Sequence, residues 1–133
     1  MPTIARPLSL ALAAAALALA LLPACEGTTR TGESYTLQAD RSIEAFLASD
    51  LKRAHEQAVL VVRDDFGYTL EREAVDAREG VIRGKTARGN PVRVDTFRDG
   101  ERVTRVEIFV GPVGDEPAMR EILSALQARL KRR

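Results

Sequence analysis

The chain has 133 residues, and its 20 Lys and Arg residues nearly balance 19 Asp and Glu residues. Without a basic excess there is no electrostatic footprint for nucleic acid, so no nucleic-acid partner is expected. A single cysteine excludes an internal disulfide, and a single histidine excludes a site built from several histidines.

The first segment has the pattern of a secretory signal. Met1 to Arg6 carries one positive charge, and Leu8 to Leu22 reads LSLALAAAALALALL without a charge. A transmembrane helix needs about 20 apolar residues, so this shorter run fits the apolar region of a signal peptide better. We therefore expect residues 1–24 to be a signal peptide.

The apolar run ends at LPAC, Leu22 to Cys25, which resembles the lipobox of bacterial lipoproteins. In that motif cleavage precedes the cysteine, which becomes the first mature residue and carries acyl chains such as palmitate. An ordinary signal peptide cut nearby would instead leave Cys25 as a free thiol, an unusual state for an exported protein. Lipidation explains both the number and the place of the cysteine, and several acyl chains together make anchoring stable.

The remainder is long enough for a single domain. Removing residues 1–24 takes away Arg6 and leaves 19 basic and 19 acidic residues. Residues 25–33 (CEGTTRTGE) are small and polar, and we expect them to be a flexible tether that begins with the lipidated cysteine. Glu26 stands where inner-membrane lipoproteins of enteric-type bacteria usually have Asp. We expect a lipid-anchored, periplasm-facing protein of the cell envelope, with the outer membrane favoured over the inner membrane.

Residues 34–133 are expected to form one α+β domain that starts with a strand and a long helix. Ser34 to Ala39 alternates polar and apolar residues, as a half-buried strand does. Asp40 is expected to cap the helix that begins at Arg41. The apolar positions of this helix recur every three or four residues and end before Gly67, a natural helix stop: Ile43, Phe46, Leu47, Leu51, Ala54, Ala58, Val61 and Val62.

Strand-like segments joined by short turns follow, over residues 68–77, 81–87, 92–97 and 102–110. Turns are expected at Glu79-Gly80, Arg88-Gly89-Asn90 and Asp99-Gly100. Asp115, Glu116 and Pro117 then open a last helix, whose apolar stripe is Met119, Ile122, Leu123, Leu126 and Leu130. The sequence thus predicts an antiparallel meander of four to five strands with two amphipathic helices packed on one face, in the order β-α-β-β-β-β-α.

This order of features resembles a family of small bacterial lipoproteins that is catalogued only as a domain of unknown function. The resemblance covers about Tyr35 to Leu130. It rests on the lipobox and on three segments: Asp65 to Tyr68 (DFGY), Gly80 to Gly89 (GVIRGKTARG) and Thr104 to Glu116 (TRVEIFVGPVGDE). The resemblance implies the fold and the location, and it implies no activity.

Three residues are candidates for chemistry. His55 lies one turn after Leu51 at the edge of the apolar stripe, and no second histidine or free cysteine exists to complete a catalytic or metal site with it. It is expected at the surface or boundary. Asp64 and Asp65 are weak metal candidates, because two adjacent carboxylates can bind a cation or perform acid–base chemistry. The alternative is that the helix frays there, so that Asp65 points to water or bonds a turn amide.

Charges of alternating sign mark the exposed face of the predicted sheet: Glu71, Glu73, Arg83, Lys85, Arg93, Asp95, Arg105 and Glu107. They indicate either cross-strand ion pairs on a solvated surface or a mixed-charge docking face for an envelope partner. We expect a membrane-anchored lipoprotein that interacts with a protein or cell-wall component and uses no cofactor. The alternative is a periplasmic domain that binds a small ligand or metal ion. An enzyme is not expected, since the sequence contains no catalytic constellation.

Overall fold

A computed structural model describes residues 26–29 and 32–132; Cys25 and the expected signal peptide lie outside this range. The elements are β1 (Glu26–Thr28), β2 (Ser34–Leu37), β3 (Ile43–Leu47), α1 (Leu51–Leu60), the π-helical turn η1 (Val61–Asp65), β4 (Thr69–Val75), β5 (Glu79–Lys85), β6 (Pro91–Arg98), β7 (Thr104–Val110) and α2 (Glu116–Lys131). The described strands form one antiparallel sheet in the order β1-β2-β3-β7-β6-β5-β4.

The α+β class is confirmed, but the prediction of four to five strands in the order β-α-β-β-β-β-α is wrong, because the sheet has seven strands. The two unexpected strands both precede α1. Residues 26–28, expected within the flexible tether, form β1 and pair with β2, with Gly27 opposite Tyr35. Residues 43–47, expected in the long helix, form β3 between β2 and β7.

The long helix begins at Leu51, not at Arg41, because a different aspartate caps it. The Asp50 side chain accepts a hydrogen bond from the Arg53 amide at 2.9 Å. Asp40 instead closes a turn, where its carboxylate accepts from the Ser42 amide at 2.9 Å. Between these aspartates every second residue faces the core, which is the period of a strand: Ile43, Ala45 and Leu47 are buried, whereas Glu44 and Phe46 face outward.

The helical segment stops at Gly67, as the sequence predicts. After α1 the chain widens into η1, where Val61 and Val62 are both fully buried although they are adjacent. The Phe66 amide then donates to the Val61 carbonyl, and the Tyr68 amide to the Val62 carbonyl. Gly67 has a φ of 64°, a left-handed conformation that glycine adopts without a steric cost.

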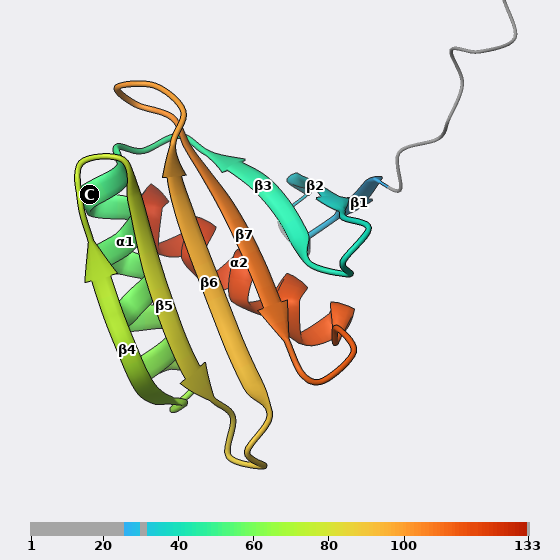
Figure 1. Cartoon of the computed structure of the whole chain (residues 1–133). Coiled ribbons are helices and arrows are strands. Elements are labelled where there is room, and N and C mark those ends of the chain that lie inside the picture. The colour runs from blue at the N-terminus through green and yellow to red at the C-terminus, as the bar shows by residue number, and fades with distance from the viewer. Residues whose placement is uncertain (1–25, 30–31, 133) are drawn as a thin grey trace, which may run out of the picture.

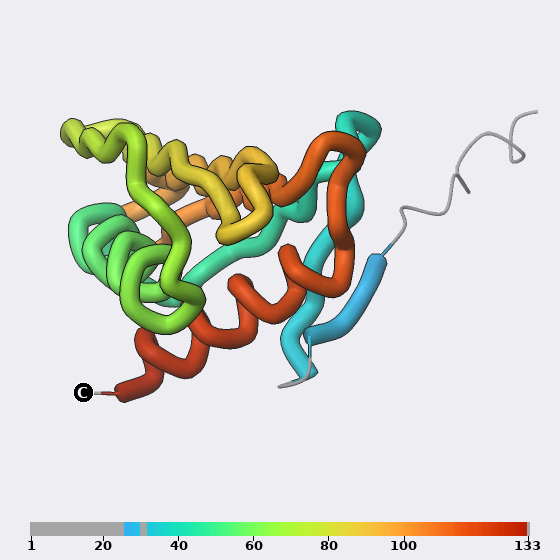
Figure 2. The backbone as a smooth tube through the Cα atoms, turned by 90° about the horizontal axis from the view of Figure 1, so that it is seen from below, coloured from blue at the N-terminus to red at the C-terminus, as the bar shows by residue number. Residues whose placement is uncertain are grey.

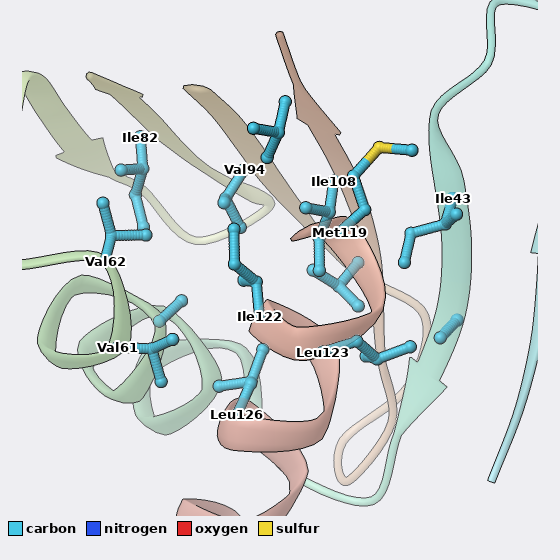
Figure 3. Close-up of a cluster of buried hydrophobic side chains, with 14 of the residues drawn as sticks. Ile43, Val61, Val62, Ile82, Val94, Ile108, Met119, Ile122, Leu123 and Leu126 are labelled. Atoms are coloured by element: carbon cyan, nitrogen blue, oxygen red, sulfur yellow. The ribbon is translucent and has the colours of Figure 1, made fainter. Parts of the chain in front are cut away.

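Both helices cover the same face of the sheet, and the opposite face is uncovered (Figures 1 and 2). The core lies between these layers, where side chains from the strands meet those from η1 and α2 (Figure 3). As predicted, Asp115 caps α2 and Pro117 stands in its first turn. The largest fully buried apolar side chains include Ile43, Val61, Val62, Ile82, Val94, Ile108, Met119, Ile122, Leu123 and Leu126.

The β1–β2 hairpin bends out of the sheet and lies along α2 (Figure 2). The buried Tyr35 on β2 donates its hydroxyl proton to the Glu116 carboxylate at 2.6 Å. Burial and this carboxylate raise the pKa of the Tyr35 hydroxyl. Thr29, after β1, donates to the Gln127 side-chain oxygen at 3.4 Å. These contacts close one side of the core with β2, which the sequence predicted as a strand, and with β1, which it did not.

Candidate functional site

The two weak metal candidates are each paired with an arginine. Asp65 forms a two-point ion pair with Arg129 of α2, with N···O distances of 2.6 and 2.8 Å. Asp64 pairs with its neighbour Arg63 at 2.8 Å. These hydrogen bonds hold the pKa of both carboxyl groups below its usual range. The arrangement docks η1 on α2, and the described residues contain no group of three or more Asp, Glu, His or Cys side chains placed to hold a metal ion.

His55 is buried, contrary to the expectation of a surface or boundary position. Its exposed fraction is 1%, because α1 turns this face toward β4, β5 and β6. Its Nε2 forms a hydrogen bond with the Glu73 carboxylate on β4, and the Glu73 side chain is 42% exposed. The pair therefore fastens an edge strand of the sheet to the helix beneath it.

A register shift turns Glu73 toward the helix. In the β4–β5 ladder, Leu70 lies opposite Gly84 and Arg72 opposite Arg83, so Glu71 has no residue of its own opposite it, as in a β-bulge. Beyond the shift the alternation is inverted, and Glu73 lies opposite the buried Ile82. The expectation that Glu71 and Glu73 share the exposed face is therefore wrong for Glu73. Glu71 pairs with Lys85 at 3.2 Å.

The other ring nitrogen of His55 packs against Gly80 in the core. Both His55 Nδ1 and Thr96 Oγ1 are buried, and neither has a hydrogen-bond partner among the described residues. Both atoms lie where a side chain of residue 80 would stand, which is possible because residue 80 is glycine. A Cβ atom on Gly80 would stand 2.5 Å from Thr96 Oγ1 and still closer to His55 Nδ1.

Replacing Glu73 with alanine is expected to lower the free energy of unfolding by about 1–2 kcal/mol, because it leaves His55 Nε2 inside the domain without an acceptor. Chemical denaturation of both proteins measures the difference. Glu71→Ala is the matched control, because it removes a carboxylate two residues away whose exposed ion pair contributes about 0–1 kcal/mol. Equal losses in the two variants would contradict a fastening role for the His55–Glu73 pair.

The uncovered face of the sheet has three parallel rows of side chains. The middle row is acidic, with Glu107 of β7 directly opposite Glu44 on one side and Asp95 on the other. Like charges in such positions repel. Arginines of the flanking rows offset the repulsion: Arg105 bonds both Glu44, at 3.2 Å, and Glu107, while Arg83 bonds Asp95 at 2.7 Å.

The flanking rows combine these arginines with phenylalanines. Phe46 and Phe97 both lie opposite Arg105, whose guanidinium stacks over the Phe97 ring at 4.2 Å. Phe109 lies opposite Arg93, and that guanidinium lies 5.2 Å from the ring centre. Three of the four phenylalanines of the chain thus face away from the core, and Phe46 is 57% exposed. The charges of this face were predicted from the sequence, and its rings were not.

The mixed surface formed by Phe46, Phe97, Phe109 and their arginines, called the open face below, has the composition of an interaction surface. Arginine and aromatic side chains are enriched where proteins bind one another, because they combine large contact area with directed polar groups. The ion pairs and stacking hold these long side chains in fixed positions. As a separate observation, no helix in the ranges 26–29 and 32–132 is long and apolar enough to cross a membrane.

A family model described as "Protein of unknown function (DUF3568)" matches residues 8–129. The matched region starts with the apolar segment before Cys25 and ends within α2, so it includes nearly all of the elements described above. No curated protein matches the chain.

Proposed function

We propose that this chain, which belongs to the DUF3568 family of proteins of unknown function, is a membrane-anchored module of the bacterial envelope that docks another protein. In this proposal Cys25 carries the lipid, the domain faces the periplasm, and the outer membrane is favoured over the inner membrane. The domain itself is non-catalytic. The match from residue 8 onward supports the anchor, because it makes the apolar segment part of the family's common sequence.

The observation that carries the docking role is the placement of Phe46, Phe97 and Phe109 on the uncovered side of the sheet. A solvent-exposed sheet face usually has polar residues at such positions, since it is favourable to remove the apolar surface of a ring from water. The alternative of a metal-binding domain has less support, because Asp64 and Asp65 are both paired with arginines.

Site-specific photo-crosslinking in the native bacterium tests the proposed function. A photoreactive phenylalanine analogue replaces Phe97 or Phe109 on the open face, or Val113 in the loop before α2. Val113 is 63% exposed and serves as the matched control. We expect a discrete adduct of the same partner from positions 97 and 109, and none from 113. No adduct at 97 and 109, or the same adduct at all three positions, would contradict docking through the open face.

A further inference from the structure

The ladder between β2 and β3 is incomplete. It has two residue pairs, Leu37 with Ile43 and Thr36 with Glu44, and in the described structure it stops there. β3 continues to Leu47, where it remains paired with β7. β2 does not follow, because Tyr35 is buried against α2 and hydrogen-bonded to Glu116. The outer half of β3 therefore has a partner strand on one side only.

Phe46 directs its main chain toward the vacant side. In an antiparallel ladder, alternate residues point their N–H and C=O groups to opposite neighbours. At the turn the Gln38 amide donates to the Ser42 carbonyl, so the main-chain groups of Ser42 point toward β2. Glu44 and Phe46, two and four residues further on, therefore point toward β2 as well. Glu44 has Thr36 opposite it, whereas Phe46 has no residue of β2 opposite it.

A cleft of about 410 Å³ occupies this vacant side. Its apolar part comes from Phe46, Leu47 and Leu130, and its polar part includes Glu33, Gln127 and Lys131. The other edge of the sheet is less suited to an added strand, because β4 is interrupted at Glu71 and carries charged residues at 71–73. Bulges and charges are the usual protection of an exposed strand edge.

We propose that this cleft binds an extended segment of a partner protein, which adds to the outer half of β3 as a short antiparallel strand. Such segments are recognised by main-chain hydrogen bonds, with specificity from alternate side chains. This inference deepens the proposed docking function, on which it rests, by naming the partner's binding segment. The partner residue beside Phe46 is apolar, because its side chain would lie against an exposed ring.

The charges around the cleft define the second requirement of the segment. Lys131 is 62% exposed and pairs with Glu33 at 2.8 Å, and Arg132 follows it in the sequence. Arg53 adds another positive charge, since its guanidinium donates to the Leu130 and Arg132 carbonyls at 3.1 and 2.7 Å. Among the described residues that line the cleft, Glu33 is the one carboxylate. An acidic residue in the segment, next to the apolar one, complements this basic end of α2.

The probes are the acetylated, amidated peptide TVEVTVE and its basic counterpart TVKVTVK, titrated into the full chain in detergent micelles. Backbone NMR follows the Phe46 amide. We expect TVEVTVE to shift this amide and slow its hydrogen exchange, and TVKVTVK to bind at least about fivefold more weakly. N-methylation of one set of alternate peptide residues should abolish binding, and N-methylation of the other set should leave it unchanged. In an added strand only alternate residues direct their N–H groups toward β3.

The variant Phe46→Pro removes the amide that points into the cleft and retains the ladder with β7, which uses Ala45 and Leu47. We expect it to lose peptide binding, and Phe46→Ala to weaken binding about tenfold. Val75→Ala, a matched loss of an exposed apolar side chain at the β4 edge, should bind like the parent. Binding of TVEVTVE that leaves the Phe46 amide unchanged, or no binding at millimolar concentration, overturns the inference. Crosslinks at positions 97 and 109 in that event would still support the proposed function.

Discussion

Replacing Gly80 with alanine is expected to lower the free energy of unfolding by about 3 kcal/mol, a large effect for the addition of one methyl group. The new Cβ would stand 2.5 Å from Thr96 Oγ1 and would also overlap His55 Nδ1. Both side chains are buried, with exposed fractions of 0% and 1%, so neither can move aside into solvent. Adding a methyl group to a well-packed core usually costs about 1–3 kcal/mol, and this position contacts two immobile groups.

Thermal unfolding measures this effect, since about 3 kcal/mol corresponds to a fall in Tm of roughly 10–20 °C in a domain of this size. Gly100→Ala is the matched control, because the nearest atom to its Cβ would be 3.8 Å away. Adding Thr96→Ala to Gly80→Ala should recover part of the loss, because the two changes affect the same space. A Gly80→Ala protein as stable as Gly100→Ala would show that His55 and Thr96 can move away from residue 80 at little cost.

Replacing Cys25 with serine is expected to abolish lipid incorporation completely. Cys25 is the only cysteine in the chain, so no second thiol can take its place. Each buried methylene of an acyl chain contributes about 0.8 kcal/mol, and loss of all chains removes the membrane affinity that the lipid supplies. Growth with an alkyne-labelled palmitate, followed by mass measurement of the purified protein, detects the modification directly.

The control for Cys25→Ser is Glu26→Gln, which alters the next residue and leaves the thiol. We expect it to incorporate label as the parent does and to lose residues 1–24 on processing. The serine variant should retain those residues, because lipoprotein processing requires the modified cysteine. Label that persists in Cys25→Ser would contradict the lipid-anchor proposal.

The sequence predicted the elements whose signals are local. The Asp115 cap, the stop at Gly67 and the strands after it depend on residues that are neighbours in the chain, and the structure has them. The turn expected at Glu79-Gly80 instead lies at Ala77-Arg78, where the Asp76 side chain accepts from the Arg78 and Glu79 amides. Gly80 belongs to β5, where its missing side chain leaves room for His55 and Thr96 to pack against the strand.

Residues 43–47 were ambiguous because two periods fit them. Ile43, Phe46 and Leu47 continue the helical spacing of α1, whereas Ile43, Ala45 and Leu47 have the spacing of a strand. Tertiary pairing decides between them: the free edge of β7 accepts β3, and Asp50 begins the helix afterwards. The sequence analysis named Asp40 alone as the cap, because the pairing with β7 that places the helix start at Asp50 is not a local signal.

The candidate site depended on long-range geometry. The inverted alternation after Glu71 comes from a register shift, and only that shift brings Glu73 to His55. The rings of Phe97 and Phe109 were visible in the strands, but the stacking of Arg105 and Arg93 on them requires the register of β6 against β7. The sequence could therefore predict charges on this face, and it could not predict a prearranged aromatic surface.

The early start of β1 limits how far an anchored domain could reach. Glu26 follows the proposed lipid site directly and already belongs to the fold, where it lies opposite Thr36. A free tether over residues 26–33 could extend roughly 25–30 Å, at about 3.5 Å per residue, and this strand removes most of that length. A domain held so closely searches in two dimensions and meets partners at a high effective concentration only near the bilayer. It therefore suits a membrane-bound neighbour better than one across the periplasm.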